Sequence, residues 1–316
     1  MTALEPEDRD WLAQALPQDV VFDEPMARHT TLRVGGPAEA LVRPASREDL
    51  VRLIRWADAR GIACLPLGAG SNILVRDRGI SGIVVLLDRC LREIVTGNAG
   101  AERPLVKAGA GLKLSALCAY GLKHGLQGFN FALGIPGTVG GSLWVNAGTG
   151  DACMGDLLES VTVLLPAGRV RTMGKAMLHF SYRKMAWPAE LKIERGRQPI
   201  ILEAAFRLRK GKRDSLRKEA GRLLKHRNRR QPWTLPSAGC IFKNPPGERS
   251  AGELIDLAGL KGKRIGDAEI STKHANFIVN RGRAAAADIL ALVDLATDAV
   301  YEHHRVKLET EVKIVG

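Results

Sequence analysis

Two glycine-rich stretches, LGAGSN at residues 67–72 and GIPGTVGGSLWVNAG at residues 134–148, constrain the fold of this chain more than any other feature. The second stretch holds five glycines in 15 residues. Glycine lets the backbone adopt positive φ and approach a ligand closely, so that successive N–H groups can converge on an anion. Ser71, Thr138 and Ser142 add hydroxyl donors. We interpret the pair as a cradle for a phosphate-bearing cofactor; tight turns alone are the alternative.

The common nucleotide-binding motifs do not account for these loops. A dinucleotide fingerprint that begins at Gly68 and Gly70 requires glycine at position 73, where the chain has Ile73. The GxxxxGK[ST] motif of P-loop proteins does not occur in the sequence. The predicted cofactor site is therefore of neither the Rossmann nor the Walker type.

Length and composition indicate an ordinary globular protein of two or three domains. The chain has 316 residues, of which 45% are hydrophobic and 26% charged. No apolar run approaches the roughly 18 residues that span a membrane, and the N-terminal residues do not resemble a secretory signal. We therefore expect a cytoplasmic protein without a membrane partner. The five cysteines lack CxxC spacing and the seven histidines lack ligand spacing, so we predict no metal site.

Apolar periodicity and breaker residues predict a mixture of helices and strands. Residues 46–61 read as a helix that Ser46 caps and Gly61 ends, and residues 111–125 as a helix closed by Gly125. Residues 160–173 read as a hairpin that turns at Ala167 and Gly168. A long helix over 284–304 precedes a final strand over 305–316.

Much of the net charge of +13 lies in residues 207–230, which hold 12 Lys and Arg and only two acidic residues. Such a run could mark a nucleic-acid site. However, Leu216, Ala220, Leu223 and Leu224 share one helical face, which favours an amphipathic helix with a solvated basic face. No aromatic residues interleave to stack on bases, so we predict no nucleic-acid partner.

Several segments together resemble the UDP-N-acetylenolpyruvoylglucosamine reductase family (MurB) of peptidoglycan synthesis. In order they are HTTLRVGGPAEALVRP, LPLGAGSNILV, GFNFALGIPGTVGGSLWVNAG, FSYRKM, PSAGCIFKNP, KHANFIVN and LETEVKIVG, between His29 and Gly316. The resemblance implies an α+β protein with an FAD-binding fold of the vanillyl-alcohol-oxidase/PCMH type. Its implied domains are two FAD-binding subdomains, 1–82 and 83–209, and a substrate domain, 210–316, with strand 305–316 packed near the first. The short spacing after Arg183 is similar to that of the compact second type of the enzyme.

The resemblance also implies the reaction and the cofactor residues. NADPH reduces bound FAD, and a hydride then passes to the enolpyruvyl ether of a UDP-N-acetylglucosamine substrate to give UDP-N-acetylmuramate. The implied FAD-binding residues are Gly35, Gly36, Gly68, Ala69, Gly70, Ser71, Asn72, Gly134, Ile135, Pro136, Gly137, Thr138, Gly140, Gly141, Ser142, Asn146, Ala147 and Gly148.

Hydride addition drives negative charge onto the substrate carboxylate, so the site needs fixed positive charge and a proton donor. The resemblance assigns the fixed positive charge to Arg183, whose guanidinium suits a carboxylate. It assigns a second role in stabilising the enolate to Glu311. Alternation along a strand places Glu309 on the same face, so spacing alone does not choose between the two acids. The proton donor falls on Cys240, where many relatives have serine; a structural loop cysteine is the alternative.

The remaining implied residues bind the substrate: Tyr182, Lys243, Asn244 and His274. Met185 stands where relatives often have serine, and this removes one expected hydrogen bond near Arg183. Two other functions stay open. One is a flavin-dependent alcohol or sugar oxidase, and the other is a basic nucleic-acid-binding protein. The sequence does not give the oligomeric state, and a monomer is compatible with it.

Overall fold

The computed structural model describes residues 3–98, 100–150, 152–191 and 197–316, which form two compact units. The first unit contains Met1–Asp23, Glu39–Ala69 and Ser81–Lys225, and the second contains Glu24–Ala38, Gly70–Ile80 and His226–Gly316. Each unit therefore combines segments that are far apart in the sequence. The three-domain division with limits near residues 82 and 209 stays a prediction.

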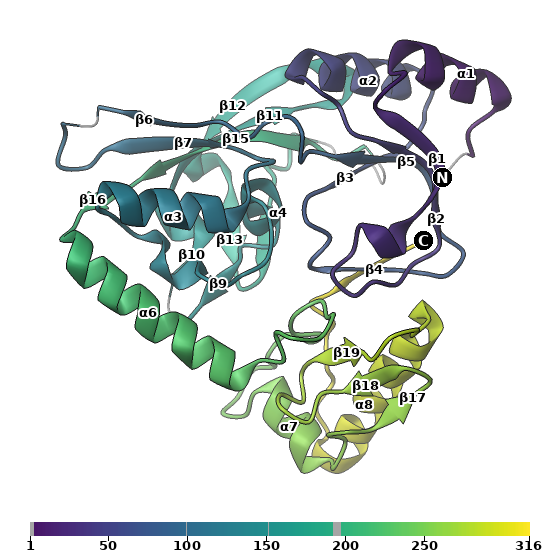
Figure 1. Cartoon of the computed structure of the whole chain (residues 1–316), viewed down its shortest axis with the longest axis vertical. Helices are drawn as coiled ribbons and strands as arrows, with labels where there is room; N and C mark the ends of the chain where they lie inside the picture. The colour runs from purple at the N-terminus through teal and green to yellow at the C-terminus, as the bar shows by residue number, and fades with distance from the viewer. Residues whose placement is uncertain (1–2, 99, 151, 192–196) are drawn as a thin grey trace. The chain divides into compact units, whose positions relative to one another are not determined.

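Two sheets organise the first unit (Figure 1). A four-stranded sheet has the order β1 (Val20–Pro25), β2 (Pro37–Val42), β5 (Ile80–Leu86), β3 (Cys64–Leu67), and the ends of β1, β2 and β5 reach into the second unit. A five-stranded sheet has the order β12 (Val170–Gly174), β11 (Leu158–Leu164), β15 (Ile200–Arg207), β7 (Leu105–Gly109), β6 (Ile94–Gly97). Strand β15 is buried along most of its length, as the central strand of a covered sheet must be.

Helices cover these sheets and short elements connect them. They are α1 (Pro6–Ala15), α2 (Arg47–Ala59), α3 (Leu114–His124), α4 (Val139–Trp144) and α5 (Met154–Leu157), with the 3₁₀ turns η2 (Phe129–Ala132), η3 (Pro166–Gly168) and η4 (Lys175–Met177). Short strand pairs join β9 (Gly148–Thr149) to β10 (Ala152–Cys153), β13 (His179–Ser181) to β14 (Lys184–Ala186), and β8 (Leu126–Gln127) to β16 (Arg209–Lys210). Helices α3 and α4 lie against one face of the five-stranded sheet (Figure 1).

Local signals in the sequence predicted several of these elements correctly. The Ser46 side chain accepts a hydrogen bond from the Asp49 N–H at the start of α2. Gly125 ends α3 in the left-handed conformation at φ 65°. The hairpin of β11 and β12 turns at Ala167 and Gly168, both of which have positive φ. The residues that determine each helix end or turn therefore lie within four positions of it in the sequence.

The basic stretch forms helix α6 (Arg213–Arg230), which runs from the first unit into the second. Leu216 and Ala220 are buried, whereas the Lys and Arg side chains are mostly exposed. Asn130 donates to the Leu216 carbonyl and to the Glu219 carboxylate, so the N-terminal half of α6 is pinned to η2 within the first unit. The prediction of an amphipathic helix is confirmed.

The second unit packs a long helix on a small antiparallel sheet. Helix α8 (Ala286–His304) contacts β18 (Ala268–Ile270), β17 (Arg264–Ile265) and α7 (Ala251–Leu257), as Figure 1 shows. Strand β19 (Ile278–Asn280) completes the sheet, and the turn η1 (Met26–Arg28) precedes β2. The buried core of this unit joins Leu32, Val34 and Leu74 to the C-terminal residues. Within the described residues, no helix combines the length and apolar character needed to cross a bilayer.

The predicted C-terminal strand over 305–316 is wrong in its extent. Only β20 (Lys313–Val315) is a strand, and it pairs in parallel with β4 (Ile73–Val75). Before it, Arg305 ends α8 with φ 56°, and Thr310 forms an isolated bridge to Phe242. Residues 309–311 therefore pair with the segment 241–243, and residues 313–315 pair with β4, so the two do not form one continuous ladder.

Candidate active site

The longer glycine loop folds tightly around the start of α4. Thr138 caps this helix by accepting from the Gly141 N–H, and its side chain is buried. A Cβ at Gly140 would lie 2.8 Å from the Ala110 Cβ. Gly134 and Gly137 have positive φ, at 75° and 154°. The loop thus needs glycine both for its backbone conformation and for its close packing.

The two glycine loops meet in the first unit. A Cβ at Gly68 would lie 2.3 Å from the Thr138 Oγ1, so a side chain at position 68 would push the loops apart. The buried hydroxyl groups of Thr138 and Ser142 lie in this region. Closely packed glycine loops with hydroxyl donors fit the pyrophosphate of a dinucleotide cofactor. Gly68 and residues 134–148 of the predicted FAD-binding set are therefore brought together here.

Another part of the predicted cofactor set lies in the second unit, where the structure gives it packing roles. Gly70 has φ 61°, and a Cβ there would lie 2.0 Å from the His29 carbonyl oxygen. A Cβ at Gly36 would lie 2.0 Å from the Asp77 carbonyl oxygen. The Asn72 side chain donates to the Glu311 carbonyl over 3.2 Å. These contacts bind the segment around Glu311 to the end of the first glycine loop.

Arg183 lies in the tight turn between β13 and β14, with φ 54°. Its Nη1 donates to the Gly148 carbonyl over 2.8 Å, and its guanidinium lies 5.3 Å from the centroid of the exposed Tyr182 ring. The buried Asn146 side chain donates to the Ser181 carbonyl and accepts from the Gly155 N–H, each over 3.0 Å. The glycine loop thus positions the arginine turn, and the Asn146 side chain helps to hold that turn. Its role in cofactor binding stays a prediction.

Met185 replaces an expected hydrogen bond near Arg183 with apolar burial. Its side chain is 8% exposed and belongs to the core of the first unit. It lies opposite Phe180 in the hairpin of β13 and β14. Burial of this side chain fixes the base of the turn that carries Arg183.

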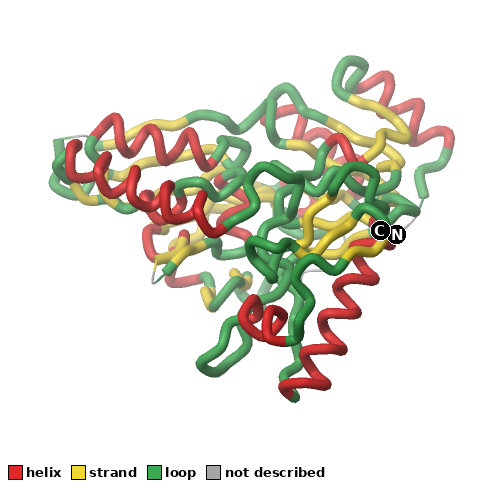
Figure 2. The backbone as a smooth tube through the Cα atoms, turned by 60° about the horizontal axis from the view of Figure 1, so that its bottom comes forward, coloured by secondary structure: helices red, strands yellow, loops and turns green. Residues whose placement is uncertain are grey.

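The loop PSAGCIFKNP lies in the second unit between α6 and α7 and contains no helix and only isolated bridges. Loops and turns, green in Figure 2, make up a large part of the backbone. Gly239 has φ 76°, which produces the bend before Cys240. Thr31 Oγ1 donates to the Ser237 carbonyl over 2.7 Å. Cys240 is half-buried.

The segment that follows Cys240 pairs through its backbone with the segment that carries Glu311, although the two are about 70 residues apart in the sequence. The Glu311 N–H donates to the Ile241 carbonyl over 2.7 Å, and the Lys243 N–H donates to the Glu309 carbonyl over 2.9 Å. The Lys243 ammonium also pairs with the Glu309 carboxylate, at 2.5 Å. Glu309 is 74% exposed at its side chain, whereas Glu311 is half-buried. The two acids that alternation left equivalent therefore have different surroundings.

The other predicted substrate residues also have defined partners. Asn244 Oδ1 accepts from the Ala251 N–H at the start of α7 over 3.1 Å. His274 Nδ1 accepts from the Asn276 N–H over 3.3 Å. Burial, with Arg230 and Lys261 nearby, holds the pKa of His274 below its ordinary value of 6.5, so its ring is neutral at pH 7.

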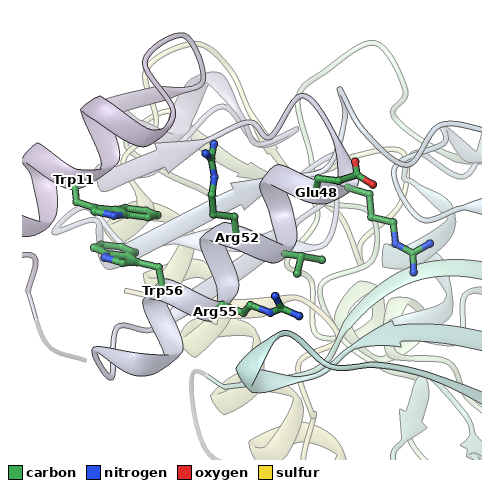
Figure 3. A pocket seen from close by; sticks show the side chains of 7 residues that line it. Trp11, Glu48, Arg52, Arg55 and Trp56 are labelled. Carbon is green, nitrogen blue, oxygen red and sulfur yellow. The ribbon is translucent and has the colours of Figure 1, made fainter.

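A separate groove lies on the first unit between α1 and α2 (Figure 3). Its volume is about 600 Å³, and its lining residues are Trp11, Arg47, Glu48, Val51, Arg52, Arg55 and Trp56. Trp11 and Trp56 stack at 4.0 Å between ring centroids. None of the residues predicted to act in catalysis or binding lines this groove, and Arg52 is already bonded to the Ala15 carbonyl and to Asp49.

Comparisons with known proteins first define the class of protein. Residues 38–174 match the model of the FAD binding domain. Residues 231–315 match the model of the C-terminal domain of UDP-N-acetylenolpyruvoylglucosamine reductase. The predicted α+β class and FAD-binding fold are confirmed, and the chain is a flavoprotein oxidoreductase.

The individual relatives then define the family. The chain is 44% identical to the UDP-N-acetylenolpyruvoylglucosamine reductase of Desulfosudis oleivorans, over 98% of each chain. It is 40% identical to the enzyme of Heliobacterium modesticaldum, over 98% of this chain and 93% of that one. The crystal structure of the Thermus caldophilus enzyme (MurB) superposes with a TM-score of 0.75 at 36% identity, covering 94% and 98% of the two chains. The chain belongs to the UDP-N-acetylenolpyruvoylglucosamine reductase family, as its motifs predicted.

Proposed function

We propose that this protein reduces the enolpyruvyl ether of UDP-N-acetylglucosamine-enolpyruvate to UDP-N-acetylmuramate, with FAD as cofactor and NADPH as electron donor. The observation that carries the assignment of roles is the 2.7 Å hydrogen bond from the Glu311 N–H to the Ile241 carbonyl. This bond pairs the segment that follows Cys240, the proposed proton donor, with the segment that carries Glu311, and it therefore supports a shared role of the two residues. Lys243, a cation suited to an anionic substrate, lies on the same segment as Cys240.

Gly68 and the loop over residues 134–148 would hold the FAD, and when bound the cofactor would supply a hydride obtained from NADPH. The residues of the chain manage the charge and the proton that complete the addition. Cys240 donates its thiol proton to the α carbon, so that one hydride and one proton add across the substrate double bond. A thiol is a stronger acid than the serine hydroxyl of many relatives, so the substitution is chemically suited to proton donation.

Arg183 stabilises the negative charge that develops on the substrate carboxylate. A guanidinium keeps its charge at any physiological pH and presents several donors in one plane. One of these donors is used on the Gly148 carbonyl, which fixes the orientation of the group. Preorganised charge of this kind stabilises a transition state without reorganisation during the reaction.

Glu311 complements Arg183 on the enolate. A protonated carboxyl group there donates a hydrogen bond to the developing anion, and the neighbouring substrate acid favours the protonated form. Glu309 is assigned no catalytic role, because its carboxylate pairs with Lys243 at the surface.

Tyr182, Lys243, Asn244 and His274 complete the proposed substrate site. Lys243 neutralises part of the diphosphate charge, and Asn244 offers amide donors to it. NADPH and nucleotide-activated sugars are cytoplasmic metabolites, so we propose a cytoplasmic enzyme without a membrane or nucleic-acid partner.

The test separates the two half-reactions. Purified protein is expected to be yellow, to be bleached by NADPH without oxygen, and to regain colour when the enolpyruvyl UDP-sugar is added. The variant Cys240→Ala is expected to accept electrons from NADPH normally but to lose about 100-fold or more in the second step. Cys240→Ser is expected to keep substantial activity.

Two outcomes would contradict this proposal. Colourless protein that binds no added FAD would remove the flavin reaction altogether. Equal second-step rates in the wild type, Cys240→Ser and Cys240→Ala would remove Cys240 from the mechanism while leaving the overall reaction in place.

A further inference from the structure

The backbone of Cys240–Lys243 belongs to no continuous strand. Gly239 bends the chain before it, and Phe242 forms only an isolated bridge, to Thr310. Ile241 and Phe242 are nevertheless buried, at 0% and 2% exposure. Buried backbone N–H and C=O groups require partners, so this segment depends on specific bonds from outside it.

Asn276 supplies these bonds along one edge of the segment. Its Oδ1 accepts from the Phe242 N–H, and its Nδ2 donates to the Phe242 carbonyl, each over 2.8 Å. Its backbone carbonyl accepts from the Ile241 N–H, also over 2.8 Å. The side-chain amide thus replaces a peptide group of a neighbouring strand, and Asn276 itself is 2% exposed.

The opposite edge of the segment pairs with residues 309–312. The Ile241 carbonyl accepts from the Glu311 N–H over 2.7 Å, and the Lys243 N–H donates to the Glu309 carbonyl over 2.9 Å. Asn276 and Glu311 therefore hold Ile241 from two sides. Cys240 directly precedes the residue that is held.

We propose that Asn276 is a positioning residue for proton transfer, because it fixes the backbone that carries Cys240 and Lys243. The inference rests on the proposed function. Among side chains of this size only an amide offers a donor and an acceptor in one plane, as the Phe242 N–H and C=O require. An ionised aspartate at this position has acceptors only and would face the Phe242 carbonyl with negative charge.

The position of the Cys240 thiol relative to the substrate carbon determines how fast the proton is transferred. A misplacement of about 1 Å at a reacting group can lower the rate about 100-fold. Asn276 touches no reacting atom in this proposal, so its effect is expected in the step in which the UDP-sugar reoxidises the flavin, which uses both Cys240 and Lys243. Electron transfer from NADPH to the flavin does not use that step.

Asn280 provides a matched control. It is also 2% exposed, and it lies in the same unit. Its Nδ2 donates to the Leu32 carbonyl over 3.0 Å, and its Oδ1 accepts from the Gly282 N–H over 2.8 Å. The Asn280 side chain therefore makes equivalent bonds, and the residues it contacts, Leu32, Arg33 and Gly282, have no assigned role in the reaction.

The experiment compares Asn276→Asp and Asn280→Asp as flavin-loaded full-length enzymes. Asn276→Asp is expected to keep the rate of flavin reduction by NADPH and to lose about 10- to 100-fold in reoxidation by the enolpyruvyl UDP-sugar. The loss is expected to shrink as the pH is lowered, because protonation of the introduced carboxylate restores a donor for the Phe242 carbonyl. Asn280→Asp is expected to lower thermal stability similarly while leaving both half-reactions near their wild-type rates.

Several results would overturn the proposal. Equal losses in the two half-reactions of Asn276→Asp, or equal behaviour of both variants, would assign Asn276 a structural role only. If Asn276→Asp and the milder Asn276→Ser both fail to bind flavin, the role is likewise structural. Wild-type protein that never reoxidises with the substrate would instead refute the proposed function, and the two failures are distinguishable.

Discussion

Asp77 stabilises the start of α8 from 209 residues away in the sequence, and its removal should weaken the second unit. Its two carboxylate oxygens accept from the N–H groups of Ala286 and Ala287, over 2.8 and 2.9 Å. The residue at the N-cap position of this helix is Ala285, whose side chain cannot accept a hydrogen bond. Asp77 therefore serves as the cap of a helix to which it does not belong.

The magnitude follows from the two contributions that Asp77→Ala removes. Loss of an N-cap costs about 1–2 kcal/mol, and loss of a negative charge at a helix N-terminus costs about 0.3–1 kcal/mol. We expect a decrease of about 2 kcal/mol in the free energy of unfolding of the second unit. With a denaturant slope of about 2 kcal/mol per M urea, the midpoint should fall by about 1 M.

Urea unfolding followed by circular dichroism measures this shift. Asp77→Asn should lie between the wild type and Asp77→Ala, because it keeps an acceptor and loses the charge. Asp294→Ala removes an exposed acid from the middle of the same helix and should change the midpoint little. A midpoint for Asp77→Ala equal to that of the wild type would refute the capping argument.

Three further predictions concern a thiol, a carboxylate and an aromatic pair. Burial raises the pKa of Cys90 to about 11. We therefore expect iodoacetamide at about pH 8 to modify Cys240 far sooner than Cys90. Peptide mapping measures the order of modification, and equal rates at the two cysteines would contradict the prediction. Hydrogen bonds from Ser250 hold the pKa of Glu253 in the folded protein below its ordinary value of 4.5. The ionised Glu253 therefore stabilises the folded protein above pH 4.5, and this contribution is lost as the pH falls through the pKa of the folded state. Accordingly, wild type and Glu253→Gln should differ in urea midpoint at about pH 7 and converge near about pH 3, and a constant difference would exclude this linkage. Trp11→Ala should lower the free energy of unfolding by about 1–3 kcal/mol, because the stacked pair of Trp11 and Trp56 in Figure 3 is lost. Trp11→Phe should lower it less. Calorimetry that ranks the two variants in the opposite order would argue against stacking.

Features that depend on neighbouring residues could be predicted from the sequence. The Ser46 cap, the Gly125 helix end and the turn at Ala167 are each determined by side chains or φ preferences within a few positions. The family motifs predicted the FAD-binding fold, because several short segments in a fixed order are more specific than any one of them.

Features that depend on distant partners could not be predicted in this way. The sequence gives no reason for Asp77 to cap α8, since the two lie 209 positions apart. The C-terminal strand was predicted too long because its alternation is satisfied first by Phe242 at Thr310 and then by β4 at Lys313. Asn276 lies in the motif KHANFIVN, and only its bonds to Phe242 show why an amide is needed at this position.

The bonds that define the Cys240 loop involve mainly the residues around Cys240. The loop is held through backbone groups of Ser237, Ile241 and Phe242 and through the bend at Gly239. The bonds of the neighbouring residues therefore fix the backbone on both sides of Cys240 in the second unit. A change from hydroxyl to thiol alters acidity and sensitivity to oxidation while leaving the supporting bonds intact. The same reasoning predicts that damage to the supports, rather than exchange of the donor atom, is the more severe perturbation of this site.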